Sequence, residues 1–152
     1  MITATEAQQT YTLGEPMLVA DAVLDLVGKY PEQFDMSYWE YDLAAEDSCG
    51  TAACIAGWVG LLHNESHRRL KKSLFILNNH EARVRVMDSW EHRQAKRLGL
   101  TEEAGNILFT LHTNELALDV LTAVSKWHTH NTGLIDRPTL RALIDGVVQT
   151  DG

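Results

Sequence analysis

An uncharged run of 17 residues, Ser48 to Asn64, constrains the fold of this chain more than any other feature. From Thr51 onward, apolar residues and glycine surround the segment on every side, which predicts a helix that is almost wholly buried. Thr51 is the expected N-cap, because its hydroxyl can accept a hydrogen bond from a free backbone N–H one turn on. Ala53, Gly57 and Gly60 recur at helical spacing, so a neighbouring backbone can approach this face closely. The run therefore predicts a central helix packed among other helices.

Hydrophobic periodicity predicts further helices on both sides of this segment. Pro16 fits the first turn of a helix whose apolar stripe ends near Gly28. Later helices are expected to begin at Ser89, Thr101, Thr113 and around Pro138. The predicted fold class is mainly α: a compact single-domain bundle of about five or six helices around the Gly/Ala-rich central helix. This domain covers residues 14–152, and residues 1–13, which lack periodicity, are expected to form an extended arm.

The secondary structure of residues 72–87 stays open at this stage. Two short apolar runs, Ser73–Leu77 and Ala82–Val86, are separated by four polar residues. Alternation with period two in the second run favours one small β-hairpin. Runs of this length are also compatible with helix. Either form is expected to place Arg83 and Arg85 on one side.

Formal charge is segregated along the chain, whose total is −8. Residues 1–50 carry ten carboxylates and one cation, residues 51–98 nine cations and four carboxylates, and residues 99–152 seven carboxylates and three cations. Two interpretations follow: the acidic and basic segments pack against each other, or each presents a patch to a partner. The overall negative charge argues against general binding of nucleic acid.

The residues predicted to bind a partner are aromatic or basic. Trp39 and Tyr41 belong to an aromatic cluster at residues 34–41, which is either a recognition platform or a loop that closes the mouth of the core. The basic candidates are Arg68, Arg69, Lys71, Lys72, Arg83 and Arg85. The expected partner is another protein or a second copy of the chain.

Two cysteines frame the start of the predicted central helix. A thiol at a helix N-terminus has a lowered pKa, so Cys49 is a candidate nucleophile, whereas Cys54 is expected to be an inert, small apolar residue. A cysteine hydrolase also needs a histidine within hydrogen-bonding reach of the thiol. His112 and His128 are available, which gives the alternative hypothesis of a cysteine-dependent enzyme acting on a small substrate.

No metal, cofactor or nucleic-acid site is predicted. His63 and His67 stand four residues apart, but their spacing from the two cysteines departs from that of zinc sites. A helix-turn-helix around Leu98–Thr101 would direct Glu102 and Glu103 toward phosphates, which need cations instead.

The segment Cys49–Gly57, with Phe34–Trp39 before it and Leu98–Ala104 after it, resembles a group of small uncharacterised proteins of bacteria and phages. That group carries a Cys-Gly-Thr-x-Ala-Cys-Ile-Ala-Gly signature between an aromatic segment and a Leu-Gly-Leu-[Ser/Thr] helix start. The similarity spans roughly residues 20 to 110. It implies a phage-associated protein but, since the group has no established activity, no function and no functional residues.

The sequence also predicts where the protein resides. Its N-terminus has no basic region before an apolar core, and the uncharged run is too short and polar for a membrane span. A cytoplasmic location without membrane association is therefore expected. The leading hypothesis is a small accessory protein that binds a macromolecular partner through its acidic and basic patches.

Overall fold

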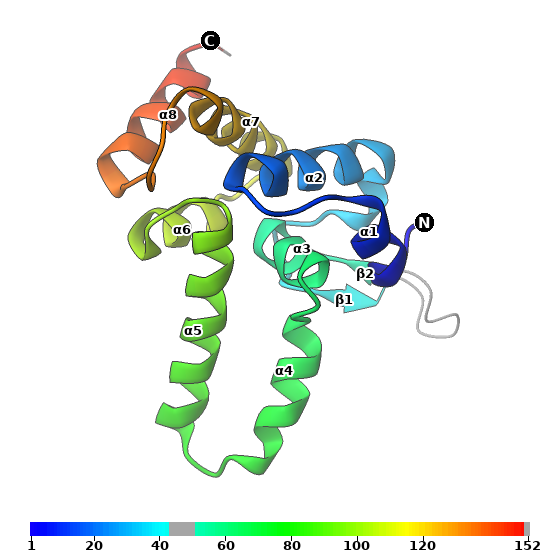
Figure 1. The fold of residues 1–152 in the computed structure, drawn as a ribbon. Coiled ribbons are helices and arrows are strands. Elements are labelled where there is room, and N and C mark those ends of the chain that lie inside the picture. Colours follow the sequence, from blue (N-terminus) through cyan, green and yellow to red (C-terminus); the bar gives the residue numbers. More distant parts are fainter. Residues whose placement is uncertain (43–50, 151–152) are drawn as a thin grey trace.

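The computed structural model describes residues 1–42 and 51–150 (Figure 1). Helices dominate this part of the chain, which contains eight α-helices, two 3₁₀ turns and two strands of two residues each. The α-helices are α1 (Ala4–Thr10), α2 (Pro16–Lys29), α3 (Ile55–Leu62), α4 (His67–Ser73), α5 (His80–Arg97), α6 (Glu102–Phe109), α7 (Asn114–His130) and α8 (Arg137–Thr150). The 3₁₀ turns are η1 (Pro31–Gln33) and η2 (Leu74–Ile76), and the strands are β1 (Tyr41–Asp42) and β2 (Thr51–Ala52).

The core is organised around α3, every residue of which is buried. The Trp58 indole N–H donates to the backbone oxygen of Gln33 at 2.7 Å, so the largest side chain of α3 is fully satisfied. A Cβ added at Gly57 would collide with the carbonyl oxygen of Trp39, and one at Gly60 would lie 2.6 Å from the Glu65 oxygen. The predicted central helix with closely approaching neighbours is confirmed.

The predicted start of the central helix at Thr51 is wrong. Thr51 and Ala52 form β2, which pairs antiparallel with β1, and the Ala53 N–H donates to the Gln33 oxygen at 3.1 Å. These long-range hydrogen bonds keep the segment extended up to Cys54. Cys54 is the N-cap instead, and its sulfur accepts from the Gly57 N–H at 3.4 Å.

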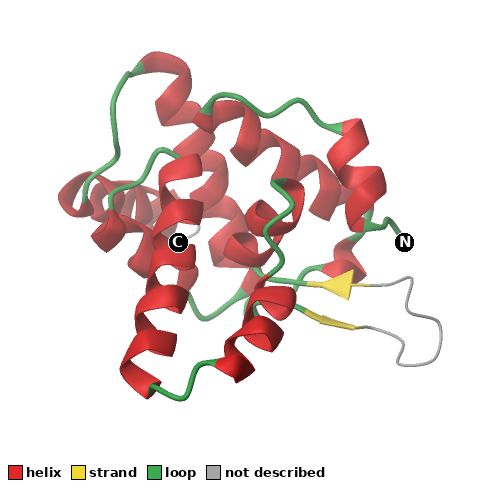
Figure 2. Ribbon diagram, turned by 60° about the horizontal axis from the view of Figure 1, so that its bottom comes forward, coloured by secondary structure: helices red, strands yellow, loops and turns green. Residues whose placement is uncertain are grey.

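The β-hairpin favoured for residues 73–86 is also wrong, because this region is helical in α4, η2 and α5 (Figure 2). Asn79 explains the difference. Its side-chain oxygen accepts from the backbone N–H groups of Glu81 and Ala82, so it caps α5 ten residues before the start expected at Ser89. Arg83 and Arg85 consequently point to different sides, since residues two apart on a helix differ by about 200°.

The extended arm expected at residues 1–13 contains helix α1. Thr3 caps this helix by accepting from the Glu6 N–H, and Ala7 is buried. The Gln33 side chain fixes Ile2, the residue before Thr3, because it accepts from the Ile2 N–H at 2.7 Å and donates to the Ile2 oxygen at 2.9 Å. The segment is thus part of the packed domain.

The mainly α, single-domain class is confirmed, although the chain has more helices than expected. Thr101 and Thr113 cap α6 and α7 as predicted, and Asp136 accepts from the Thr139 N–H at the start of α8. Helix α2 begins at Pro16 and buries the predicted apolar stripe against α7. Among the described residues, no helix is long and apolar enough to cross a membrane.

Candidate functional site

Helices α4 and α5 project from the rest of the molecule as an αα-hairpin (Figures 1 and 2). We call residues 66–97 the basic hairpin, because residues 66–87 contain six cations and one carboxylate. Ser66 caps α4 by accepting from the Arg69 N–H at 3.2 Å, and its hydroxyl donates to the Glu40 carboxylate at 2.8 Å. The cap therefore also fixes α4 to the segment that precedes β1.

Most cations predicted to bind a partner lie on the surface of the basic hairpin. Lys71, Lys72 and Arg85 are exposed, and none of them forms an ion pair with a carboxylate within residues 1–42 or 51–150. Arg83 is half-buried, and its Nε donates to the Leu77 oxygen at 2.6 Å, which orients its guanidinium. Residues 66–87 thus present an excess of positive charge to solvent.

A cavity of about 240 Å³ opens between the two helices near the tip of the basic hairpin. Its lining residues are Lys71, Leu74, His80, Arg83 and Met87. Leu74 is buried and Met87 half-buried, so the interior of the cavity is apolar. The cationic residues Lys71 and Arg83 also line it. Beyond it, Ile76 at the tip is 85% exposed, which is unusual for a large apolar side chain.

Three rings join the base of the basic hairpin to the core. The ring of His67 stacks on Trp39 at 5.5 Å and meets Trp90 edge-on at 4.8 Å. Burial lowers the pKa of His67 to about 4, and the nearby charge of Lys71 adds to this, so the ring is neutral at pH 7. Trp39 is half-buried and packs against the core, which is compatible with a loop that closes the core, and its predicted role in binding stays a prediction. Tyr41 lies in β1, and its side chain is outside the described part of the structure.

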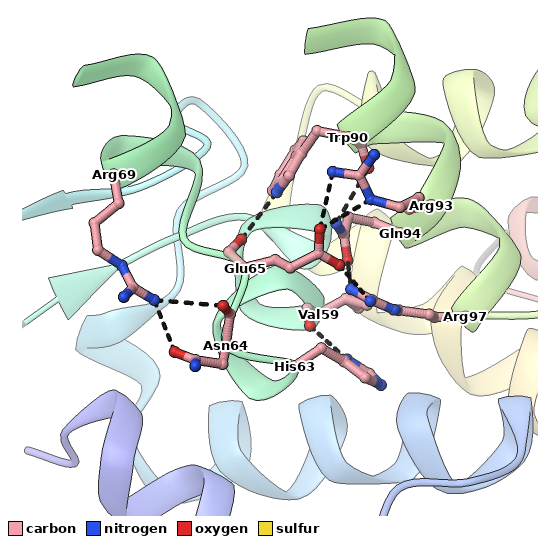
Figure 3. A network of polar contacts seen from close by, with 9 residues as sticks. All are labelled: Val59, His63, Asn64, Glu65, Arg69, Trp90, Arg93, Gln94 and Arg97. Carbon is pink, nitrogen blue, oxygen red and sulfur yellow. Dashed lines mark hydrogen bonds and ion pairs between the residues drawn. The ribbon is translucent and has the colours of Figure 1, made fainter. Parts of the chain in front are cut away.

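Glu65 links the turn before α4 to α5 (Figure 3). Its carboxylate accepts from Arg93 Nε at 2.9 Å and forms ion pairs with Arg93 and Arg97, while its backbone oxygen accepts from Trp90 at 2.9 Å. Burial alone would raise the pKa of Glu65, but the Arg93 hydrogen bond and the Arg97 charge outweigh it and lower the pKa. The carboxylate stays ionised and holds α5 beside the start of α4.

The structure does not bring the predicted catalytic histidines together. His112 is exposed in the turn before α7, whereas His128 lies in the last turn of this helix, about 20 Å away at about 1.5 Å per residue. The His128 ring hydrogen-bonds to the Leu98 oxygen at 2.8 Å and fills the space beside Gly99. One thiol cannot use both histidines. Cys49 lies outside the described residues, so its predicted reactivity stays a prediction.

Cys54 is no nucleophile at neutral pH. Burial raises the pKa of its thiol to about 12, although the Gly57 N–H partly offsets this effect. His63 and His67 serve structural contacts: the His63 Nδ1 bonds to the Val59 oxygen at 2.7 Å, and His67 belongs to the ring cluster. No group of three potential ligands that could hold a metal ion occurs among the described residues.

Several residues in or next to the basic hairpin were not predicted from the sequence. Leu74 and Met87 line the cavity, and Glu65, Trp90 and Arg93 interact at the base of the hairpin. Glu65 offered a weak signal, because it is the only carboxylate between Thr51 and His80. Its partners lie 28 and 32 residues along the chain, and no local pattern reveals contacts at that separation.

Comparisons with protein-family models, with curated proteins and with solved structures found no match to this chain. The resemblance of Cys49–Gly57 to small bacterial and phage proteins therefore stays a prediction. The functional argument depends on the geometry and charge of the basic hairpin.

Proposed function

We propose that this chain is a protein-binding module whose basic hairpin docks an acidic, amphipathic helical segment of a partner protein. The observation that carries the proposal is the apolar cavity between α4 and α5, which Lys71 and Arg83 flank on a projecting element. An association with phages, as the signature implies, is compatible with such an accessory role.

The chemistry of the cavity matches an amphipathic helix. Its apolar interior at Leu74 and Met87 suits one large aliphatic or aromatic side chain of the partner. Carboxylates one turn away on the partner helix would then reach Lys71 and Arg83. The exposed Ile76 extends the apolar surface toward the tip. A partner helix with apolar residues at i, i+3 or i+4 and i+7, and acidic residues beside them, satisfies both features.

The charge of the whole molecule favours a protein partner over nucleic acid. Residues 66–87 carry +5 in a chain of total charge −8, so the rest of the molecule is strongly acidic. A long polyanion bound along the basic hairpin would also meet this acidic remainder, whereas a short helix would not. The apolar interior of the cavity, unlike the cations that flank it, also offers a phosphate backbone no hydrogen bond.

The test is fluorescence anisotropy with a labelled acidic amphipathic peptide. Matched peptides replace either its glutamates by lysines or its apolar residues by serines, and single- and double-stranded DNA of similar length are titrated in parallel. We expect the acidic amphipathic peptide to bind, and neither the two substituted peptides nor the DNAs. Tighter binding of either DNA than of the peptide would overturn the proposal in favour of nucleic acid.

Charge reversal locates the site. The variant Lys71→Glu/Arg83→Glu is expected to weaken peptide binding about tenfold or more, because two attractions become repulsions. The control Lys126→Glu/Arg141→Glu makes the same charge change at exposed positions of α7 and α8, away from the basic hairpin. Equal losses in both variants would mean that overall charge, and not the cavity, determines binding.

A further inference from the structure

A second cavity, of about 270 Å³, lies at the base of the basic hairpin. Arg69 and Ser73 line it from α4, Trp90 and Arg93 from α5, and Glu65 from the turn between α3 and α4. Residues two apart on a helix differ by about 200°, so Arg69 lies on the other side of α4 from Lys71. On this helix the two cavities are therefore lined by different residues, and they share none on α5 either.

The two arginines of this cavity are oriented but not saturated. Arg69 uses Nη2, which donates to the side-chain oxygen of Asn64 at 2.8 Å, and Arg93 uses Nε and Nη2 on Glu65 (Figure 3). A guanidinium has five N–H donors. Within the described residues, Nε and Nη1 of Arg69 and Nη1 of Arg93 have no hydrogen-bond acceptor.

Positive charge is in excess around the cavity. The Glu65 carboxylate is shared by Arg93 and Arg97, so one negative charge offsets two positive ones. Arg69 is held by an amide, which is neutral. A further anion would balance this charge without displacing any existing bond.

Three other polar side chains that line the cavity are already engaged. The Ser66 hydroxyl donates to Glu40, the Ser73 hydroxyl donates to the Leu70 oxygen at 2.7 Å, and the Trp90 N–H donates to the Glu65 oxygen. Recognition would therefore come from the two guanidiniums, whose planar N–H groups match the oxygens of carboxylates and phosphates.

We propose that this cavity is an oxyanion site, which takes a phosphoryl or carboxylate group between Arg69 and Arg93. Glu65 and Asn64 act as positioning residues, because each holds one arginine. The site is independent of the proposed docking of a partner helix, since the two cavities share no lining residue. Either proposal can fail without the other.

Arginine-detected NMR tests the site directly. Inorganic phosphate and acetate are titrated separately into the ¹⁵N-labelled protein against sodium chloride of equal ionic strength, and the Nε–H signals of Arg69, Arg93 and Arg85 are followed. Saturable shifts of Arg69 and Arg93, with Arg85 unchanged, support the proposal. The tighter of the two probes identifies the phosphoryl or the carboxylate group as the preferred ligand. Shifts of all three signals, or of none, would overturn it.

A pair of variants separates recognition from folding. Arg69→Gln removes one guanidinium whose described hydrogen bonds go only to Asn64, and it is expected to weaken binding of the preferred probe about tenfold or more. Lys72→Gln removes an exposed cation on the same helix outside the cavity and is expected to change the affinity less than about threefold. The same loss in both variants would reduce the effect to general electrostatics and contradict the site.

Discussion

Gly57 is required by a contact with Trp39. The Cβ of any other residue would overlap the Trp39 carbonyl oxygen and approach the Ala53 Cβ to 2.8 Å, and the backbone atoms cannot move aside without disturbing the ring cluster. We expect Gly57→Ala to lower the free energy of unfolding by about 1–3 kcal/mol, as overpacking of a core does. Urea unfolding measures this change.

Gly28 supplies the matched control for Gly57. It also lies in a helix, α2, but a Cβ added there meets no atom within 4 Å. Gly28→Ala is expected to leave stability unchanged or to raise it by up to about 1 kcal/mol, because alanine favours helix. A Gly57→Ala variant as stable as Gly28→Ala would contradict the steric requirement for glycine beside the Trp39 carbonyl oxygen.

His67 makes stability depend on pH in a defined direction. Its pKa is about 4 in the folded protein against 6.5 for an unperturbed histidine, so between these values the unfolded chain binds more protons. The contribution of His67 is therefore fully present above about pH 6.5 and is lost as pH falls toward about 4. We expect His67→Phe, which keeps a ring between Trp39 and Trp90, to flatten the fall in stability over this range. The measurement compares the slope of unfolding free energy against pH in the His67→Phe variant and in the unmodified protein. Parallel slopes would contradict the prediction.

At the scale of elements, the first turn of α5 depends on Asn79. This side chain is the cap that the sequence analysis missed, and the neighbouring helix packs only loosely there, since the apolar cavity lies between the two. Asn79→Ala is expected to cost about 1 kcal/mol and to raise amide exchange in residues 80–84 more than in the core. Asn78→Ala, at an exposed position between η2 and α5, is the control. Equal exchange in the two variants would contradict the role of the cap.

Elements with both a helix-start signal and an amphipathic stripe could be predicted from the sequence. Pro16, Thr101 and Thr113 start helices whose buried faces follow helical spacing, so local signals and tertiary packing agree. The start of α3 could not be predicted, because Thr51 is held extended by its pairing with Asp42 in β1 and Ala53 by its hydrogen bond to Gln33. In the basic hairpin, Val84 and Val86 alternate with arginines at the period of a β-strand, which led to the wrong prediction. The Asn79 cap starts a helix there instead.

The proposed binding surface was predictable only as a set of charges. The sequence identifies the cations at residues 68–85. It does not show whether acidic segments of the same chain pack against them or leave them exposed to a partner. In the structure, Glu65 pairs with Arg93 and Arg97 inside the basic segment itself, and Glu40 accepts from Ser66 at its edge. Lys71, Lys72 and Arg85 remain exposed on a projecting hairpin. Pairing at such sequence separations is decided by the fold and not by composition.

At the scale of the whole molecule, the basic hairpin stands out from an acidic remainder, and this asymmetry predicts how binding responds to salt. Positive charge on a projecting element attracts an acidic helix before contact, so charge acts mainly on the rate of association. The Debye length falls from about 30 Å at about 0.01 M salt to well below 10 Å at about 0.5 M. We expect the association rate constant of the acidic amphipathic peptide to fall about tenfold or more over this range.

The dissociation rate constant is expected to change less than about threefold over the same range, because the apolar contact with Leu74 and Met87 is insensitive to screening. Stopped-flow anisotropy measures both rates. Lys71→Gln/Lys72→Gln should lower the salt dependence of association, whereas Lys126→Gln/Arg141→Gln, which removes the same charge elsewhere, should leave it nearly as steep. If the two variants respond alike, the attraction arises from the net charge of the molecule, and the basic hairpin has no special part in capturing its partner.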